Sequence, residues 1–285
     1  MSTRILVQTT IPKTLDDWHV GRFSRLVQFL SALPGVAVTA RDLEREPNGA
    51  DRVLSNLDRS SFDQLWLFAV DVGDGLSARD SAGIEAFRRR GGGVLAARDH
   101  QDLGSSLLGL SDLGQAHYFH TKNPDPREDF RRIDDSETTS IVWPNYHSGR
   151  NGDAQAVVVE RRDHPLMQFP DAPSGVLEWF PAHPHEGGVG APHANAVVVA
   201  TGRSALTGRP FNLMVAGETP AGRWIAESSF HHLADYNWDP STGAPSFVTE
   251  LPGDGLAREP SRLRHIEAYV RNAARWLSRA SSRDT

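Results

Sequence analysis

A strand, a helix, three glycines and a second strand follow one another in residues 62–104, and this order constrains the fold more than any other stretch. Residues 65–70 are continuously apolar, which is typical of a strand covered on both faces in a parallel sheet. The glycines at 91–93 end the helix and allow a tight return into the next buried strand at 94–97. The stretch therefore predicts an α/β fold built on a parallel sheet.

The segments around this unit extend the same pattern. Residues 4–9 and 36–43 are predicted strands, and a helix capped by Asp16 and Asp17 is predicted to run to about residue 33. Strands joined in this way require right-handed crossovers and hence a parallel sheet. Beyond residue 103 the pattern loosens, with predicted strands at 154–160 and 195–201, a hairpin of 212–216 with 222–228, a long loop at 231–255 and a closing helix at 263–277. We expect one domain spanning 1–285, with a frayed tail at 278–285.

Charged side chains collect where the strand at 94–97 ends, at Arg98, Asp99, His100 and Asp102. In an open α/β sheet, ligands bind outside the carboxyl ends of the strands, so a site is expected here. Asp99 and His100 would then form a general base held by a carboxylate, and Arg98 would contact the substrate. The alternative interpretation, compatible with the first, is that Asp99 or Asp102 caps a helix.

The composition excludes several functions. The chain has no cysteine, which rules out disulfides, thiolate zinc sites and a cysteine nucleophile. A net charge of −6 and the lack of any basic run longer than three arginines argue against nucleic-acid binding. No stretch approaches the roughly 20 apolar residues that a membrane span needs, and the first residues read as a strand rather than a signal peptide. A cytoplasmic protein without nucleic-acid or membrane partners is expected.

Five short segments resemble, in order, the trehalose-utilisation (ThuA-like) family. The segments are the glycine-rich turn and strand at 91–97, Asp163-His164-Pro165, Glu178-Trp179-Phe180, Gly222-Arg223 followed by His231, and the helix at 272–277. The resemblance covers the chain from the third predicted strand to its end. It rests on the order and spacing of the segments rather than on any single signature.

This resemblance implies a class I glutamine amidotransferase-like fold. Such a fold is a flavodoxin-like doubly wound, mainly parallel sheet, here with long loop insertions in the second half, and the family is linked to carbohydrate metabolism. True amidotransferases carry a cysteine in the turn where this chain has Arg98, Asp99 and His100, so glutaminase chemistry is excluded. Family members typically have a histidine near the Arg98 position, and a glycine where Phe230 precedes His231.

Most of the twelve histidines lie in predicted loops after Gly93. If the loops holding His100, His120 and His231 meet above the strand ends, three imidazoles would form a divalent, zinc-like metal site with an open position for hydrolysis. No HExxH motif supports this site, and the alternative is that these histidines lie at the surface. Such a metal is the only cofactor that the sequence indicates.

Aromatic residues accompany a carboxylate further along the chain. Glu178 precedes Trp179 and Phe180, which favours an acid–base group with aromatic walls for a sugar, or else a solvent-facing strand residue. Tyr236 and Trp238 would also stack on a sugar ring, with His232 beside them in a loop dense in polar residues. The alternative role for these aromatics is core packing.

Together these features predict an enzyme that acts on a small polar, sugar-derived substrate by hydrolysis or related acid–base chemistry. Asp99, His100, Glu178 and His231 are the predicted catalytic residues. The alternative is a non-catalytic amidotransferase-like domain that binds a ligand or a partner, which the missing cysteine favours. A homodimer is expected for this fold.

Overall fold

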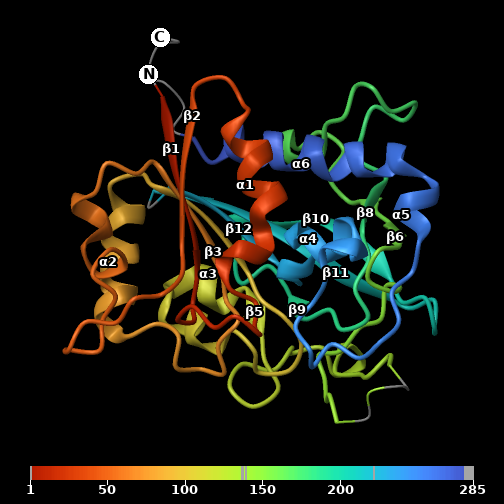
Figure 1. Ribbon diagram of the computed structural model, residues 1–285, viewed down its shortest axis with the longest axis horizontal. Coiled ribbons are helices and arrows are strands. Elements are labelled where there is room, and N and C mark those ends of the chain that lie inside the picture. Colours follow the sequence, from red (N-terminus) through yellow and green to blue (C-terminus); the bar gives the residue numbers. More distant parts are fainter. Residues whose placement is uncertain (1, 136–137, 139, 221, 279–285) are drawn as a thin grey trace.

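The computed structural model describes residues 2–135, 138, 140–220 and 222–278 (Figure 1). Within this part of the chain, eight strands form one central sheet. In spatial order they are β2 (Val36–Arg41), β1 (Thr3–Thr9), β3 (Gln64–Phe68), β4 (Gly93–Ala97), β12 (Gly222–Glu227), β11 (Pro210–Thr219), β10 (Ala196–Arg203) and β7 (Val158–Val159).

The sheet is mixed but mainly parallel, as the sequence predicts. The five strands from β2 to β12 are parallel, and β11, β10 and β7 continue the sheet antiparallel. With β12 counted as the fifth parallel strand, their order is the 2-1-3-4-5 of flavodoxin-like doubly wound folds. The fifth strand arrives only after a long insertion between β4 and β12.

Helices cover both faces of the sheet. Neighbouring residues of a strand point to opposite faces, so each strand contributes to the apolar clusters on both sides. Ile5 and Val7 of β1 share one apolar cluster with α1 (Ser24–Ser31) and α6 (Leu263–Trp276). Leu6 belongs to the cluster on the other face, with α2 (Ala78–Arg89). Both faces are therefore buried, which explains the continuous apolar runs.

The remaining elements are short. Three are helices: α3 (Ser111–Gln115), α4 (Asp235–Trp238) and α5 (Gly255–Arg258). Two strand pairs lie outside the central sheet: β5 (His117–Tyr118) with β9 (Gly188–Val189), and β6 (Ala154–Ala156) with β8 (Trp179–Pro181). The 3-10 helices of the described residues are η1 (Val20–Phe23), η2 (Leu54–Arg59), η3 (Ser105–Gly109), η4 (Glu128–Phe130), η5 (Pro165–Met167), η6 (Phe230–Leu233), η7 (Pro240–Thr242) and η8 (Pro260–Arg262).

Several predicted boundaries are wrong. The first helix does not start at Asp16 and Asp17: η1 begins at Val20 with His19 as its N-cap, and Asp16 instead accepts a hydrogen bond from the Ser246 amide (2.7 Å). The strand predicted at 154–160 divides into β6 and β7, and the loop predicted at 231–255 contains short helical turns. The predicted frayed tail lies outside the described residues, except for Ser278.

Within the described ranges, no helix has the length and apolar character that crossing a lipid bilayer requires.

The loop after β4 turns sharply at Gly104, which holds a left-handed backbone with φ of +81°. A Cβ atom at this position would lie 2.8 Å from both Cβ and the carbonyl oxygen of Ala69. Asp99 and His100 lie in the same loop, so the path of the main chain that carries them depends on a residue without a side chain at position 104.

We predict that Gly104→Ala lowers the free energy of unfolding by about 2 kcal/mol or more, because a left-handed backbone and a steric clash both act against it. Gly49→Ala is the matched control, since Gly49 has the same φ of +81° but nothing within 4 Å of its Cβ position. Urea denaturation of the two variants measures the difference. Equal losses would show that the contact with Ala69 is unimportant.

Candidate metal centre

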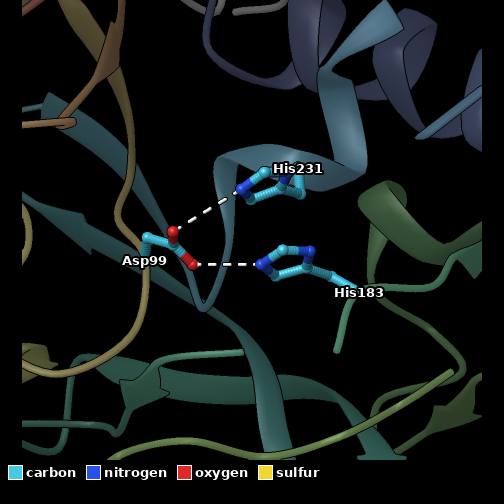
Figure 2. Close-up of side chains that lie close together, drawn as sticks. All are labelled: Asp99, His183 and His231. Carbon is cyan, nitrogen blue, oxygen red and sulfur yellow. Dashed lines mark ion pairs between the residues drawn. The ribbon is translucent and has the colours of Figure 1, made fainter. Parts of the chain in front are cut away.

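Three segments distant in the sequence bring Asp99, His183 and His231 together (Figure 2). Asp99 follows β4, His231 lies in η6 just after β12, and His183 follows β8. The Asp99 oxygens Oδ1 and Oδ2 lie 3.3 Å from His183 Nε2 and 3.5 Å from His231 Nε2, respectively. All three side chains are buried, and one ligand atom from each lies within 4.8 Å of the others.

The sheet itself places two of these residues side by side. β4 and β12 are parallel neighbours, with Ala97 opposite Glu227 at their carboxyl ends. The Phe230 amide then donates to the Arg98 carbonyl oxygen (2.8 Å), which locks the two exit segments together. Asp99 and His231 are the residues that immediately follow this hydrogen bond.

A chain of amide hydrogen bonds fixes the His231 tautomer. The carbonyl oxygen of Ala182 can only accept, so the amide group that approaches it at 2.8 Å must be Asn237 Nδ2. The Asn237 oxygen Oδ1 consequently faces His231 Nδ1 at 3.0 Å. Because this oxygen can only accept, His231 carries its proton on Nδ1.

The same chain fixes the His183 tautomer. Asn237 Nδ2 also donates to Asn151 Oδ1 (2.8 Å), which sets the orientation of the Asn151 amide. That oxygen lies 2.9 Å from His183 Nδ1 and accepts a hydrogen bond from its N–H. In their neutral forms, both imidazoles therefore present an unprotonated Nε2 to the Asp99 carboxylate.

The charges of Asp99, His183 and His231 follow from their burial and their contacts with one another. Burial and the neighbouring His231 hold the pKa of His183 well below its usual value, so this ring is neutral. Burial opposes ionisation of Asp99, and its pKa falls well below its usual value only through positive charge on His100 and His231 and hydrogen bonds from His183 and His231. With both Nε2 atoms unprotonated, a cation would have to supply that positive charge. The His183 and His231 rings are stacked with centroids 3.5 Å apart, which disfavours a positive charge on both.

Two nitrogen lone pairs facing a carboxylate repel it unless a cation lies between them. Among the described residues, neither Asp99 Oδ1 nor His183 Nε2 has a hydrogen-bond partner. Two ligand atoms at tetrahedral positions around zinc, with bonds of 2.0–2.1 Å, are about 3.4 Å apart. The observed separations of 3.3 and 3.5 Å agree with that value. The group therefore has the donor set, the spacing and the hydrogen-bonded outer residues of a divalent metal site.

This group lies at the base of a pocket of about 330 Å³. His100 and His185 also line the pocket. His100 Nε2 is 3.7 Å from Asp99 Oδ2, and burial lowers the pKa of His100 to about 4. His185 is held by Glu250 (Nε2 to Oε1, 3.0 Å) and faces Asn145 with Nδ1. The pocket thus places a further neutral imidazole, His100, beside Asp99, His183 and His231.

A buried network of charged residues connects the segments that carry His183 and His231. His232 lies between Glu186 (3.1 Å) and Glu227 (3.4 Å), all fully buried. Burial alone would lower the pKa of His232, but the two carboxylates outweigh it and raise this pKa to about 10. Glu186 also accepts from Ser148 and Ser228, at 2.7 Å each. The network joins the segment of His183 to the segment of His231.

The structure brings together three of the four residues predicted to be catalytic: Asp99, His100 and His231. Arg98 does not face this pocket. It is completely buried, packs over the Phe119 ring (4.2 Å) and donates to the main-chain oxygens of Gln101 and Leu103, and burial lowers its pKa to about 9. Arg98 therefore braces the loop of Asp99 instead of contacting a substrate directly.

The other predicted substrate-binding residues also lie elsewhere. His232 belongs to the buried network described above. Tyr236 and Trp238 are 7% and 6% exposed and pack in the core, because the segment after β12 coils into α4 against the sheet. Glu178 and Trp179 line a different hollow, next to Arg262 and His265, because β8 pairs with β6 and contacts α6.

His120 lies outside the metal centre. Its ring packs against Trp143 at 5.1 Å, after the short strand β5. In place of His120, the structure brings in His183, from the glycine-, proline- and histidine-rich loop that follows β8. Asn151 and Asn237, which set the tautomers, carry no sequence signal of their own.

Comparisons with known proteins concern the architecture alone. No protein-family model matches the sequence, and no curated protein does. A putative ThuA-like protein from Parabacteroides merdae is 14% identical, with 89% of this chain and 96% of that chain covered and a TM-score of 0.48. The glutaminase domain of a CTPS from Trypanosoma brucei is 15% identical (96% and 94% covered, TM-score 0.47). A cytoplasmic protein from Salmonella typhimurium is 12% identical (96% and 98% covered, TM-score 0.45).

We predict that the purified protein binds one equivalent of zinc, and that Asp99→Asn or His183→Gln weakens this binding by at least about 100-fold, because each removes a ligand atom. His120→Gln is the control, since this histidine lies outside the centre. Isothermal titration calorimetry with zinc chloride measures the affinities. Unchanged binding in Asp99→Asn would contradict the assignment.

We also predict that Asn237→Ala weakens zinc binding about 10- to 100-fold, because the donor that fixes both imidazole tautomers is lost. The matched control is Asn195→Ala, an exposed asparagine outside the hydrogen-bond chain. Nitrogen NMR of the two imidazoles reports the tautomers directly. Wild-type tautomers in Asn237→Ala would show that the amide chain does not set them.

Proposed function

We propose that this protein is a metal-dependent hydrolase that acts on a small polar group, with Asp99, His183 and His231 holding one divalent ion. The observation that carries the proposal is the pair of unprotonated Nε2 atoms aimed at a buried carboxylate at the base of a pocket. Two histidines and one carboxylate leave at least one coordination position for water or substrate, as in hydrolytic zinc sites.

A divalent ion in such a site supplies Lewis acidity and a water molecule that ionises near neutral pH. Hydrolysis adds the hydroxyl group of water to the acyl carbon, breaks its bond to the leaving oxygen or nitrogen, and transfers a proton to that leaving atom. No oxidant or further reactant is needed. The missing cysteine is consistent with this route, because no covalent acyl-enzyme is formed.

His100 is the residue placed to carry that proton. It lines the pocket next to Asp99, and no described residue hydrogen-bonds to its Nδ1. A neutral imidazole at this position can take a proton from water and return it to the leaving atom. His185 is less suited, because Glu250 and Asn145 engage both of its ring nitrogens.

The competing proposal is a binding domain without turnover. A metal-loaded protein that binds ligands but hydrolyses none would favour it. The cytoplasmic location and the homodimer expected from the sequence stay predictions.

We predict that the zinc-loaded protein hydrolyses simple carboxylic esters and amides, and that removal of zinc with a chelator abolishes turnover until zinc is restored. His100→Gln should lower kcat by about 100-fold while zinc affinity stays unchanged, because general acid–base catalysis contributes 10²–10⁴-fold. His120→Gln serves as the control with full activity. Turnover that is indifferent to zinc would overturn the proposal.

A further inference from the structure

We propose that the substrate of this site is an ester or amide with an apolar acyl group, which lies along the wall between the metal centre and the mouth of the pocket. This inference rests on the proposed function for its reacting end. It adds the chemical class of the acyl part of the substrate, beyond the reacting carbonyl group. It proposes an apolar acyl group where the sequence resemblance predicts a sugar.

The pocket has two chemically different ends. Its base is polar and buried, with Asp99, His183 and His231 each no more than 4% exposed. Toward the mouth, apolar side chains alternate with polar ones such as Asp17, Thr138, Thr249 and Glu250. The apolar part of this wall is formed by Trp18, Val70, Val72, Leu103, Ile141, Phe230, Phe247 and Val248. A ligand that fills the pocket therefore needs a polar head at the base and an apolar portion toward the mouth.

Apolar surface begins directly at the metal ligands. Phe230 stacks on the His231 ring with centroids 4.4 Å apart, and Trp18 meets the same ring edge-on at 4.5 Å. These rings exclude water from one side of the base. The carbon atoms next to a reacting carbonyl group would meet aromatic surface there, which disfavours a heavily hydroxylated neighbour.

At the mouth, the apolar wall is exposed to solvent. Val72 is 74% exposed and Phe247 is 58% exposed, although both line the pocket. Leu251, which follows Glu250 in the sequence and is 78% exposed, lines the adjacent hollow instead. Large apolar side chains that gather in the open around a pocket mark a surface that binds apolar groups. Their continuity with the base indicates that this surface receives part of the substrate.

The tryptophans that the sequence predicts for a sugar ring do not line this pocket. Trp238 is committed to the core, where its Nε1 donates to the His232 carbonyl oxygen at 2.7 Å. Trp179 lies in another hollow, with the Arg262 guanidinium 3.7 Å from its ring. The aromatic side chains that do line the pocket are Trp18, Phe230 and Phe247, and none of them belongs to the predicted sugar site.

The test measures how n-alkyl hydroxamates bind to the zinc-loaded protein. The hydroxamate head group binds zinc, and the alkyl chain varies in length. Dissociation constants of acetohydroxamate, butyrohydroxamate, hexanohydroxamate and octanohydroxamate are measured by calorimetry. Burial of each methylene favours binding, so we expect the dissociation constant to fall by up to about fourfold per methylene. Equal affinities along the series would overturn the inference.

Two variants locate the alkyl chain. Val72→Asp and Phe247→Asp should each flatten the dependence on chain length, measured relative to acetohydroxamate in the same variant, because both side chains are exposed and line the pocket. Leu206→Asp is the matched control, since Leu206 is 54% exposed but does not line this pocket. Full chain-length dependence in both pocket variants would contradict the inference.

The experiment separates this inference from the proposed function. A protein that binds no zinc refutes the proposed function before any hydroxamate is added. A protein that binds zinc and acetohydroxamate, but gains nothing from longer chains, retains the metal site and refutes the acyl group.

Discussion

One main-chain carbonyl group, that of Ala182, sets the chemistry of the whole centre. Because it can only accept a hydrogen bond, it orients Asn237, and Asn237 in turn orients Asn151. Each asparagine oxygen then accepts a hydrogen bond from the Nδ1–H of one histidine and leaves its Nε2 unprotonated. A backbone atom cannot be rotated or titrated, so the two tautomers are determined by the fold rather than by the pH of the medium.

The position of that carbonyl group depends in turn on buried charges. The Ala182 segment lies between β8 and Glu186, whose carboxylate is held by His232, Ser148 and Ser228. Removing one partner from such a network leaves an uncompensated charge in the interior, which is far more costly than the net gain from the intact network. This asymmetry makes the network a rigid support that resists rearrangement. Asp99, His231 and His183, which follow β4, β12 and β8, can therefore keep their separations without contacts from solvent.

The parts of this design that the sequence predicts are those with a local pattern. Apolar runs and glycines at 62–104 predict β3, α2 and β4, and the rule that ligands bind at the carboxyl ends of strands then points to Asp99 and His231. His183 follows β8, which has only three residues and pairs with an equally short strand. No periodicity marks such an element, so its place over the sheet could not be predicted. Asn151 and Asn237 act through orientation, which depends on contacts between distant segments. The position of Glu178 could not be predicted either, because the direction of β8 is set by its pairing with β6.

In this arrangement, a single proton would not do what the proposed divalent ion would do. One proton on His183 Nε2 would satisfy Asp99 Oδ1, but His231 Nε2 would still direct its lone pair at Oδ2, 3.5 Å away. A second proton would charge both rings, whose centroids are only 3.5 Å apart in a buried stack. A divalent ion would instead accept a lone pair from each of the three residues and leave both imidazoles neutral. Its two positive charges would also compensate the buried carboxylate, which no arrangement of a single proton does for all three groups at once.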